Sequence, residues 1–381
     1  VFSGMGMYYL GPVDGHDIGK LETVIRWARE LRKPVLVHVV TKKGKGYKYA
    51  EEHPEKFHGV GRFDIETGEL HDSGDCFSAK MGESLSRLAD GDGRIIGITA
   101  AMSSGTGMDV FSAAHPDRFF DVGIAEGHAV SMAGGMAKQG MVPVFAVYSS
   151  FLQRGYDMLI HDVALQNLHV VFCVDRAGLV GSDGETHHGV FDVSYLSSVP
   201  DMTVLCPASY AELETMLRAA IYDINGSVAI RYPRGGEGKY TACNTAPETL
   251  LREGRDVTLV CYGIMTNEVL DAAERLAAEG ISAEVIKLSM IKPPDFDLVM
   301  RSLRKTGKLL ISEDVCEAGC VGSRILEEAA INEIHVRAAK LLNLGEGIVP
   351  HGTVAELLHD FGLDADGIVS AAMEMMDKDL K

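Results

Sequence analysis

Glu126 is the side chain whose surroundings most clearly suggest chemistry. It stands in D-V-G-I-A-E-G-H at residues 121–128, in a turn of small residues between an aromatic-rich predicted strand and a predicted helix. A glutamate at a helix start is usually a surface carboxylate that the helix dipole favours. A catalytic carboxylate must instead be buried and held by a rigid element, so that its proton stays shared with a ligand. The strand-to-helix junction supplies such a support, which makes Glu126 a candidate catalytic residue.

Three arginines follow three different predicted strands. Arg154, Arg176 and Arg234 stand in Y-S-S-F-L-Q-R, D-R-A-G and R-Y-P-R-G. A single arginine is most often a solvated surface residue, but the ends of parallel strands converge on one crevice. Guanidinium groups bind phosphate oxygens in a bidentate manner, so three of them together in an acidic protein predict an anion site. Strand alternation places the neighbouring Arg231 on the opposite face from Arg234.

Two aromatic residues, Tyr148 and Phe151, flank Ser149-Ser150 at the end of an apolar predicted strand. Aromatic residues in such a place usually belong to the core. The carboxyl edge of a parallel sheet, however, is where ligand sites form. Both rings are therefore candidates for ligand contact.

A glycine-rich loop, G-S-D-G-E-T-H-H-G at residues 181–189, contains Asp183, His187 and His188. Such loops are flexible connectors by default. An aspartate and histidines in a glycine-rich segment also suit proton transfer beside a sugar hydroxyl. Asp183 and His187 are the candidates, and His188 has weaker support. A metal site in this loop is disfavoured, because nothing else in the sequence supplies the remaining ligands.

These segments resemble the 1-deoxy-D-xylulose-5-phosphate synthase family of transketolase-like thiamine-diphosphate enzymes, and the resemblance extends along the whole chain. It implies that Glu126 hydrogen-bonds the aminopyrimidine ring of thiamine diphosphate and promotes the tautomer that removes the C2 proton. It places Phe151 against the face of that ring and Tyr148 near the phosphorylated acceptor. The family usually has glutamine where this chain has Gly127.

The resemblance also implies roles for other residues of the chain. The substrate-binding set holds the acceptor and its phosphate, and consists of Tyr148, Arg154, Arg176, Asp183, His187 and Arg234. His58, in K-F-H-G-V-G, is expected to relay protons near the thiazolium ring, and Tyr47, after G-K-G, to touch the cofactor. The catalytic set is then Glu126, His58 and His187, and the cofactor-binding set is Tyr47, Glu126 and Phe151.

The implied reaction joins pyruvate to D-glyceraldehyde 3-phosphate with loss of CO2 and gives 1-deoxy-D-xylulose 5-phosphate, a precursor of isoprenoids, thiamine and pyridoxal. Three alternatives stay open: a transketolase, a beta-type subunit of pyruvate dehydrogenase, and a non-catalytic fragment that needs a partner chain. The segments G-P-V-D-G-H-D at 11–17 and T-K-K-G-K-G-Y at 41–47 resemble remnants of a diphosphate-binding domain. A beta-type subunit lacks that domain, so the remnants count against it.

The elements that must position these residues form three blocks. Residues 1–72 contain a helix predicted over 18–31 and a strand predicted over 35–40, and we expect them to be the C-terminal remnant of the diphosphate-binding domain with a linker. Residues 73–245 and 246–381 each alternate apolar strands with amphipathic helices, which predicts an α/β fold with parallel sheets covered on both faces. By resemblance these blocks are the pyrimidine-binding domain and the transketolase C-terminal-like domain. Within them, residues 151–166 are predicted to be one helix, and Thr266 is predicted to cap the N-terminus of a helix that Gly280 ends.

Composition limits the partners of the chain. The net charge of -18 argues against nucleic acid and anionic membranes, which require basic patches. No apolar run approaches the roughly 20 residues of a membrane span. The seven cysteines are scattered and form no C-x-x-C pair, which predicts reduced thiols and a cytoplasmic location. The family resemblance implies a homodimer.

The cofactor diphosphate in this family is held through Mg²⁺ by G-D-G, followed some 25–30 residues later by asparagine. Gly91-Asp92-Gly93 supplies the letters, but the next asparagine is Asn167, and the triplet precedes a predicted strand. We predict a turn there. The Mg²⁺ ligands are expected in an N-terminal part outside this sequence, either in the same protein or in a separate polypeptide, and the 381 residues alone are expected to be incomplete.

Overall fold

The computed structural model describes residues 1–54, 56–70 and 74–377. The chain divides into two compact units, Val1–Ser73 and Gly74–Lys381. The first unit is small, and the second contains two sheets.

The first unit is built on a short βαβ arrangement. Strand β1 (Tyr8–Asp14) pairs in parallel with β2 (Val35–Val40), and α1 (Ile18–Glu30) connects them. A 3-10 turn, η1 (Phe2–Met5), precedes β1, and α2 (Lys48–Glu52) follows β2. The helix predicted from Ile18 and the strand predicted at 35–40 are confirmed. No residue of α1 is buried, since only two strands are available to cover it.

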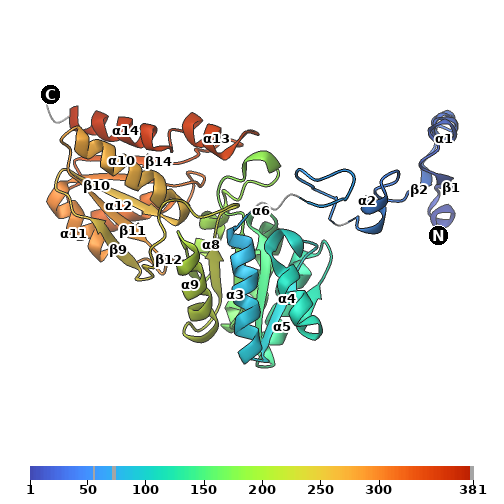
Figure 1. Ribbon diagram of the computed structural model, residues 1–381, viewed down its shortest axis with the longest axis horizontal. Helices are drawn as coiled ribbons and strands as arrows, with labels where there is room; N and C mark the ends of the chain where they lie inside the picture. The colour runs from blue at the N-terminus through green and yellow to red at the C-terminus, as the bar shows by residue number, and fades with distance from the viewer. Residues whose placement is uncertain (55, 71–73, 378–381) are drawn as a thin grey trace. The chain divides into compact units, whose positions relative to one another are not determined.

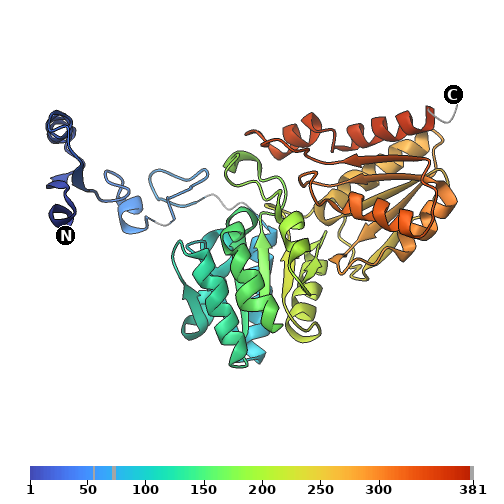
Figure 2. The same ribbon diagram turned by 180° about the vertical axis from the view of Figure 1, so that it is seen from behind.

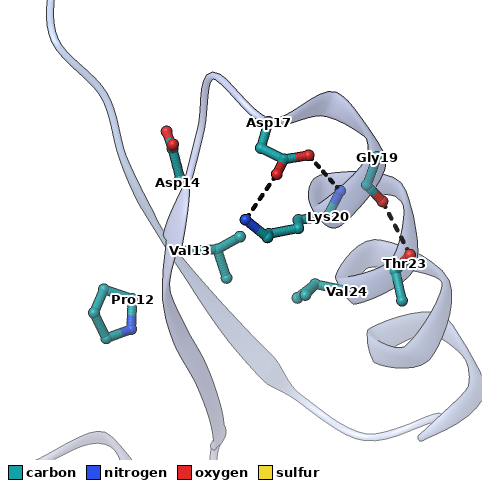
Figure 3. Close-up of a pocket in the computed structure, with 8 residues that line it drawn as sticks. All are labelled: Pro12, Val13, Asp14, Asp17, Gly19, Lys20, Thr23 and Val24. Atoms are coloured by element: carbon teal, nitrogen blue, oxygen red, sulfur yellow. Dashed lines mark hydrogen bonds and ion pairs between the residues drawn. The ribbon is translucent and has the colours of Figure 1, made fainter.

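A depression lies between β1 and α1 in the first unit (Figure 3). The Asp17 carboxylate there accepts a hydrogen bond from the backbone N–H of Lys20 and forms an ion pair with the Lys20 ammonium group, at 2.8 Å. This interaction closes the first turn of α1. The depression contains none of the residues predicted to bind cofactor or substrate.

The second unit begins with a seven-stranded sheet in the order β12-β7-β8-β6-β5-β3-β4. Its strands are β3 (Ile95–Thr99), β4 (Phe119–Asp121), β5 (Val142–Tyr148), β6 (Val171–Asp175), β7 (Thr203–Leu205), β8 (Val228–Arg231) and β12 (Met290–Lys292). All neighbours run parallel except β12, which is antiparallel to β7. Strands β3, β6 and β8 are buried along their whole length, as expected for a sheet covered on both faces.

Helices cover both faces of this sheet. On one face α3 (Phe77–Gly91) and α9 (Tyr210–Tyr222) bury Phe77, Leu85 and Leu213 in one hydrophobic cluster, with α4 (Met108–Ala114) beside them (Figure 1). On the other face, seen in Figure 2, α5 (Glu126–Lys138) and α8 (Asp192–Ser198) bury Val130 and Leu196 in a second cluster. These helices hold the strand ends in place from both sides.

The prediction of one continuous helix over 151–166 is wrong. The segment is a series of short pieces: α6 (Ser149–Leu152), η4 (Gln153–Gly155), α7 (Tyr156–Met158), a π-helical turn η5 (Leu159–Val163) and η6 (Ala164–Gln166). Its backbone approaches α5 closely, since a Cβ added at Gly155 would lie 2.8 Å from Val130 Cγ2, and one added at Gly134 would lie 2.8 Å from the Asp162 carbonyl. The apolar periodicity of the sequence gives no sign of this close contact. The segment accommodates it by changing between α-helical, 3-10 and π-helical turns.

The second sheet has the order β14-β13-β10-β11-β9. Its strands are β9 (Glu248–Arg252), β10 (Val257–Tyr262), β11 (Ala283–Leu288), β13 (Lys308–Ser312) and β14 (Ala338–Leu342), and its helices are α10 (Thr266–Ala278), α11 (Asp297–Thr306), α12 (Val321–Ile331), α13 (Val354–Asp360) and α14 (Ala365–Asp377). Strand β9 is antiparallel to β11, and the other pairs are parallel. The predicted α/β class is confirmed, with one antiparallel edge strand in each sheet.

The predicted ends of α10 are partly corrected. Thr266 is the first helical residue and not the cap, and the capping position is Met265, without a side-chain cap. The preceding 3-10 turn η8 (Gly263–Met265) already directs the backbone into the helix. Gly280 follows the end of the helix with φ of 81°, as a glycine after a helix C-terminus commonly does.

Buried charges join the two sheets of the second unit. Arg231, at the end of β8, lies 2.9 Å from the Asp192 carboxylate and 3.5 Å from the Asp314 carboxylate, which follows β13. Lys287 of β11 lies 3.0 Å from Glu212 of α9, and both side chains are fully buried.

Strand β12 follows the predicted boundary at 245/246 in the chain but belongs to the first sheet. That boundary stays a prediction.

Replacing Arg231 by methionine should lower the free energy of unfolding by about 3–5 kcal/mol, because the buried carboxylates of Asp192 and Asp314 lose their cation. Denaturant unfolding at pH 7 measures the loss. The matched control is Arg218→Met, since the Arg218–Asp223 pair is exposed and contributes about 0–1 kcal/mol. A loss as small as that of the control would contradict the structural role given to Arg231.

Candidate active site

Glu126 is the first residue of α5, and only 3% of the residue is exposed. The turn before it is held by Asp121 at the end of β4, whose Oδ1 accepts hydrogen bonds from the backbone N–H groups of Ala101 and Gly123. Gly123 has φ of 70°, a conformation that glycine adopts without strain. A buried carboxylate thus stands on a rigid strand-to-helix junction, as the sequence predicts.

The partner of Glu126 in the structure is Arg154. Nη1 of Arg154, in η4, lies 3.1 Å from Glu126 Oε1, and 60% of the arginine side chain is exposed. The guanidinium carbon also lies 5.5 Å from the centre of the Phe151 ring. Arg154 therefore connects the buried carboxylate to the predicted aromatic residues and to solvent.

The predicted aromatic residues form one group. The rings of Tyr148 and Phe151 are stacked with their centres 5.7 Å apart, and the His187 ring meets Phe151 edge-on at 5.2 Å. Tyr148 ends β5, Phe151 belongs to α6, and His187 lies in the loop 181–189. Burial raises the pKa of the Tyr148 hydroxyl, so this group stays protonated at neutral pH.

Arg176 follows β6 and lies over Tyr148. Its guanidinium carbon is 3.8 Å from the ring centre, and Nη1 donates a 2.7 Å hydrogen bond to the Gly105 carbonyl. Its φ of 57° is unusual for a residue other than glycine, and such strained residues cluster at functional sites. Glycine is needed at 105, because an added Cβ would lie 1.7 Å from the Tyr148 hydroxyl oxygen.

Asp183 lies between two of the predicted arginines. Its carboxylate is 2.9 Å from Arg234 Nη1 and 3.6 Å from Arg176 Nε. Arg234 Nη1 also contacts the carbonyl of Val180 and the hydroxyl of Ser182, both at 3.0 Å. Two guanidinium groups thus share the Asp183 carboxylate, and Arg176 Nη1 also lies 3.4 Å from Asp175 Oδ1.

Asp175, the last residue of β6, is a buried carboxyl that the sequence analysis did not single out. Burial raises its pKa to about 6, and Arg176 opposes the shift. Because this folded-state pKa is above the ordinary value of 3.8, the stability linked to protonated Asp175 is present below about pH 4 and is lost as the pH rises through about 6. The sequence signal that could have identified Asp175 is its position directly before Arg176.

Two neighbouring residues serve the fold. His188 is buried: its Nδ1 accepts a hydrogen bond from the Val180 N–H, and its Nε2 lies 3.2 Å from the Pro350 carbonyl. Burial lowers the pKa of this imidazole. Arg231 is committed to Asp192 and Asp314, so it does not join Arg176 and Arg234 around Asp183.

Tyr47 and His58 belong to the first unit, so their predicted roles are considered within that unit alone. The Tyr47 hydroxyl donates a 2.9 Å hydrogen bond to the Ile65 carbonyl, and its ring packs against Phe57 and Phe63. These contacts give Tyr47 a local structural role. Its contact with a cofactor, and the proton relay through His58, stay predictions.

Gly91 is the last residue of α3, and Asp92 and Gly93 belong to the predicted turn that leads into β3. The Asp92 carboxylate accepts hydrogen bonds from the backbone and side chain of Arg94, and the side-chain bond lowers its pKa.

Among the described residues no group of three or more histidine, cysteine, aspartate or glutamate side chains is placed to hold a metal ion. Within the same residues, no helix is both long enough and apolar enough to cross a membrane.

Three family models match the chain. A model described as the transketolase pyrimidine binding domain matches residues 77–236, and one described as the transketolase C-terminal domain matches residues 248–368. A third, described as 1-deoxy-D-xylulose-5-phosphate synthase, matches residues 1–41. The site described above lies within the first of these regions.

Two solved structures share the fold. A split gene transketolase, described as an inactive beta4 tetramer, superposes with a TM-score of 0.72 and 29% identity, over 79% of this chain and 98% of its own. A transketolase from Leishmania mexicana superposes with a TM-score of 0.64 over 79% of this chain and 45% of its own. Its 17% identity supports the fold alone.

Curated relatives cover the chain almost completely. A 1-deoxy-D-xylulose-5-phosphate synthase of Heliobacterium modesticaldum is 45% identical over 100% of this chain, and one of Clostridium acetobutylicum is 44% identical over 96%. The chain spans 60% of the length of each of these relatives. The three family models and these relatives show that the chain is similar to 1-deoxy-D-xylulose-5-phosphate synthases and carries the pyrimidine-binding and C-terminal regions of transketolase-like proteins.

Proposed function

We propose that this chain carries the catalytic glutamate and the acceptor site of a 1-deoxy-D-xylulose-5-phosphate synthase, a thiamine-diphosphate-dependent transferase that joins pyruvate to D-glyceraldehyde 3-phosphate and releases CO2. The supporting observation is a continuous row of contacts along one edge of the first sheet. It runs from Glu126 through Arg154, Phe151, Tyr148 and Arg176 to Asp183 and Arg234.

One end of the row fits the aminopyrimidine of the cofactor. Glu126 is a buried carboxylate able to share a proton with a ring nitrogen, and Phe151 offers an aromatic face for stacking. Bound thiamine diphosphate supplies the nucleophile and the electron sink for decarboxylation of a 2-oxo acid. The role of Glu126 is to hold a proton at the ring nitrogen, and the role of its junction is to keep that carboxylate still.

The other end of the row fits a phosphorylated acceptor. Arg176 and Arg234 share Asp183, so a phosphate with two negative charges competes for both guanidinium groups. Asp183, released in part from these arginines, is then free to accept a hydrogen bond from a substrate hydroxyl. His187 lies beside Phe151 and is the candidate proton carrier between the two ends.

We propose that the diphosphate and Mg²⁺ are held by a diphosphate-binding domain of which residues 1–72 form the C-terminal part, supplied in the same protein or as a separate polypeptide. Residues 73–245 and 246–381 are then the pyrimidine-binding and C-terminal domains of a cytoplasmic homodimer with a role in isoprenoid and thiamine biosynthesis. The match of the synthase model to residues 1–41 supports this arrangement. The similarity to a split gene transketolase supports the alternative in which the diphosphate-binding domain is a separate polypeptide.

A transketolase is the second candidate, because two transketolase domain models match the chain. The donor substrate separates the two. A synthase consumes pyruvate with glyceraldehyde 3-phosphate and releases CO2, whereas a transketolase consumes xylulose 5-phosphate. Turnover of xylulose 5-phosphate without use of pyruvate would favour the transketolase.

Replacing Glu126 by glutamine or alanine should lower turnover at least about 100-fold, because the variants lack the carboxylate that shares a proton with the cofactor ring. Exchange of the cofactor C2 proton, followed by NMR in the active protein that contains this chain, should slow to a similar extent. Glu214→Gln is the control, since Glu214 is an exposed partner of Arg87. Wild-type exchange in either Glu126 variant would exclude the assigned role.

Replacing Arg234 by alanine should raise the KM for glyceraldehyde 3-phosphate about 10–150-fold, since a charge-assisted hydrogen bond to phosphate is worth about 1.5–3 kcal/mol. The KM for pyruvate should stay unchanged. Arg87→Ala, which removes an exposed arginine, serves as the control. Equal rises for both substrates would count against a phosphate site at Arg234.

The need for a diphosphate-binding domain is tested by calorimetry. The 381 residues alone should bind thiamine diphosphate weakly and without dependence on Mg²⁺. Adding the diphosphate-binding domain, in the same chain or as a second polypeptide, should produce tight binding that requires Mg²⁺. Tight, Mg²⁺-dependent binding to the 381 residues alone would disprove the proposed division of the site.

A further inference from the structure

The loop that carries Asp183 and His187 is anchored at both ends in the C-terminal half of the second unit. Leu179 and Val190 flank the loop, and both are buried in a cluster with Met265, Leu344, Val349, Leu357 and Leu363. The Val190 carbonyl also accepts a 2.9 Å hydrogen bond from the Cys316 N–H. The ends of the loop are thus packed against residues from outside the first sheet.

Close backbone contact strengthens this anchoring. Gly178 has φ of 76°, and an added Cβ there would lie 1.7 Å from Asp314 Oδ2. Gly181, at the start of the 3-10 turn η7 (Gly181–Asp183), leaves space for the backbone N–H of Val354, which a Cβ would approach to 3.1 Å. The loop therefore lies directly against the segment that begins α13.

His351 is the side chain that reaches the turn itself. Its Nε2 lies 3.2 Å from the Ser182 carbonyl and donates a hydrogen bond to it, and its Cδ2 lies 3.1 Å from the Cβ position of Gly184. The support of His351 is rigid, because Thr353 and Glu356 form a capping box at the start of α13. His351 thus holds the residue next to Asp183 from a fixed helix start.

The side chains that contact this turn respond differently to a ligand. Arg234 contacts Ser182 and Asp183, but a phosphate competes for the same guanidinium group. The hydrogen bond of His351 goes to the backbone carbonyl of Ser182 and not to an anion-binding side chain. We therefore expect this hydrogen bond to persist when the acceptor binds.

We propose that His351 is a positioning residue that keeps Asp183 and His187 in place for the acceptor substrate. This inference rests on the proposed function, since it assigns the acceptor to this loop. According to this proposal, the C-terminal half of the second unit influences the affinity for the acceptor but not the affinity for pyruvate, the donor.

The test compares His351→Phe, which removes the N–H donor but keeps a ring, with His351→Gln, which keeps a donor. In the active protein that contains this chain, the phenylalanine variant should raise the KM for glyceraldehyde 3-phosphate about 2- to 12-fold, the range expected for one lost hydrogen bond. The KM for pyruvate should not change, and the glutamine variant should lie closer to wild type. His359→Phe is the control, because His359 is an exposed residue of α13 whose partner is Asp364.

Hydrogen exchange gives a readout that does not depend on turnover. The N–H groups of Gly184 and His187 bond to the carbonyls of Gly181 and Gly184, and they should exchange faster in His351→Phe than in wild type or in His359→Phe. Unchanged exchange together with unchanged KM would overturn the inference, and so would equal rises in both KM values. A wild-type protein that does not convert pyruvate and glyceraldehyde 3-phosphate would refute the proposed function, while the exchange rates still decide whether His351 holds the loop.

Discussion

The parallel direction of β3, β5, β6 and β8 is the constraint on which the candidate site depends. Parallel strands all end at one edge of the sheet, so residues that follow different strands converge there. Tyr148 ends β5, Arg176 follows β6, and Arg234 follows β8. Each is far from the others in the chain, and the sheet alone brings them together.

Charge balance explains how so many ionised groups share this edge. Each arginine of the site has a carboxylate within reach: Glu126 for Arg154, and Asp183 for Arg176 and Arg234. Such pairs limit the cost of desolvating the groups. They also keep the guanidinium groups oriented while leaving them able to exchange a carboxylate for a phosphate. The ion pairs therefore serve both stability and binding.

The two sheets of the second unit depend on each other. Strand β12 belongs by sequence to the C-terminal half but completes the first sheet beside β7. The fully buried Lys287–Glu212 pair and the ion pairs of Arg231 with Asp192 and Asp314 lie at the same contact between the two sheets. Because removal of one member leaves a buried charge, these contacts hold the halves in one arrangement. The loop that carries Asp183 packs against this contact between the sheets, at Asp314. The geometry of the site therefore depends on the C-terminal half of the unit.

The sequence by itself determined the α/β class, the main strands and the burial-prone junction at Glu126, because apolar periodicity and turn chemistry are local properties. It did not predict the broken helix at 149–166, the transfer of β12 to the other sheet, or the contact between His351 and Ser182. These depend on which distant backbones approach one another, at Gly134 and Gly155 for example. Local residue patterns carry no direct record of such approaches, so only the tertiary structure decided them.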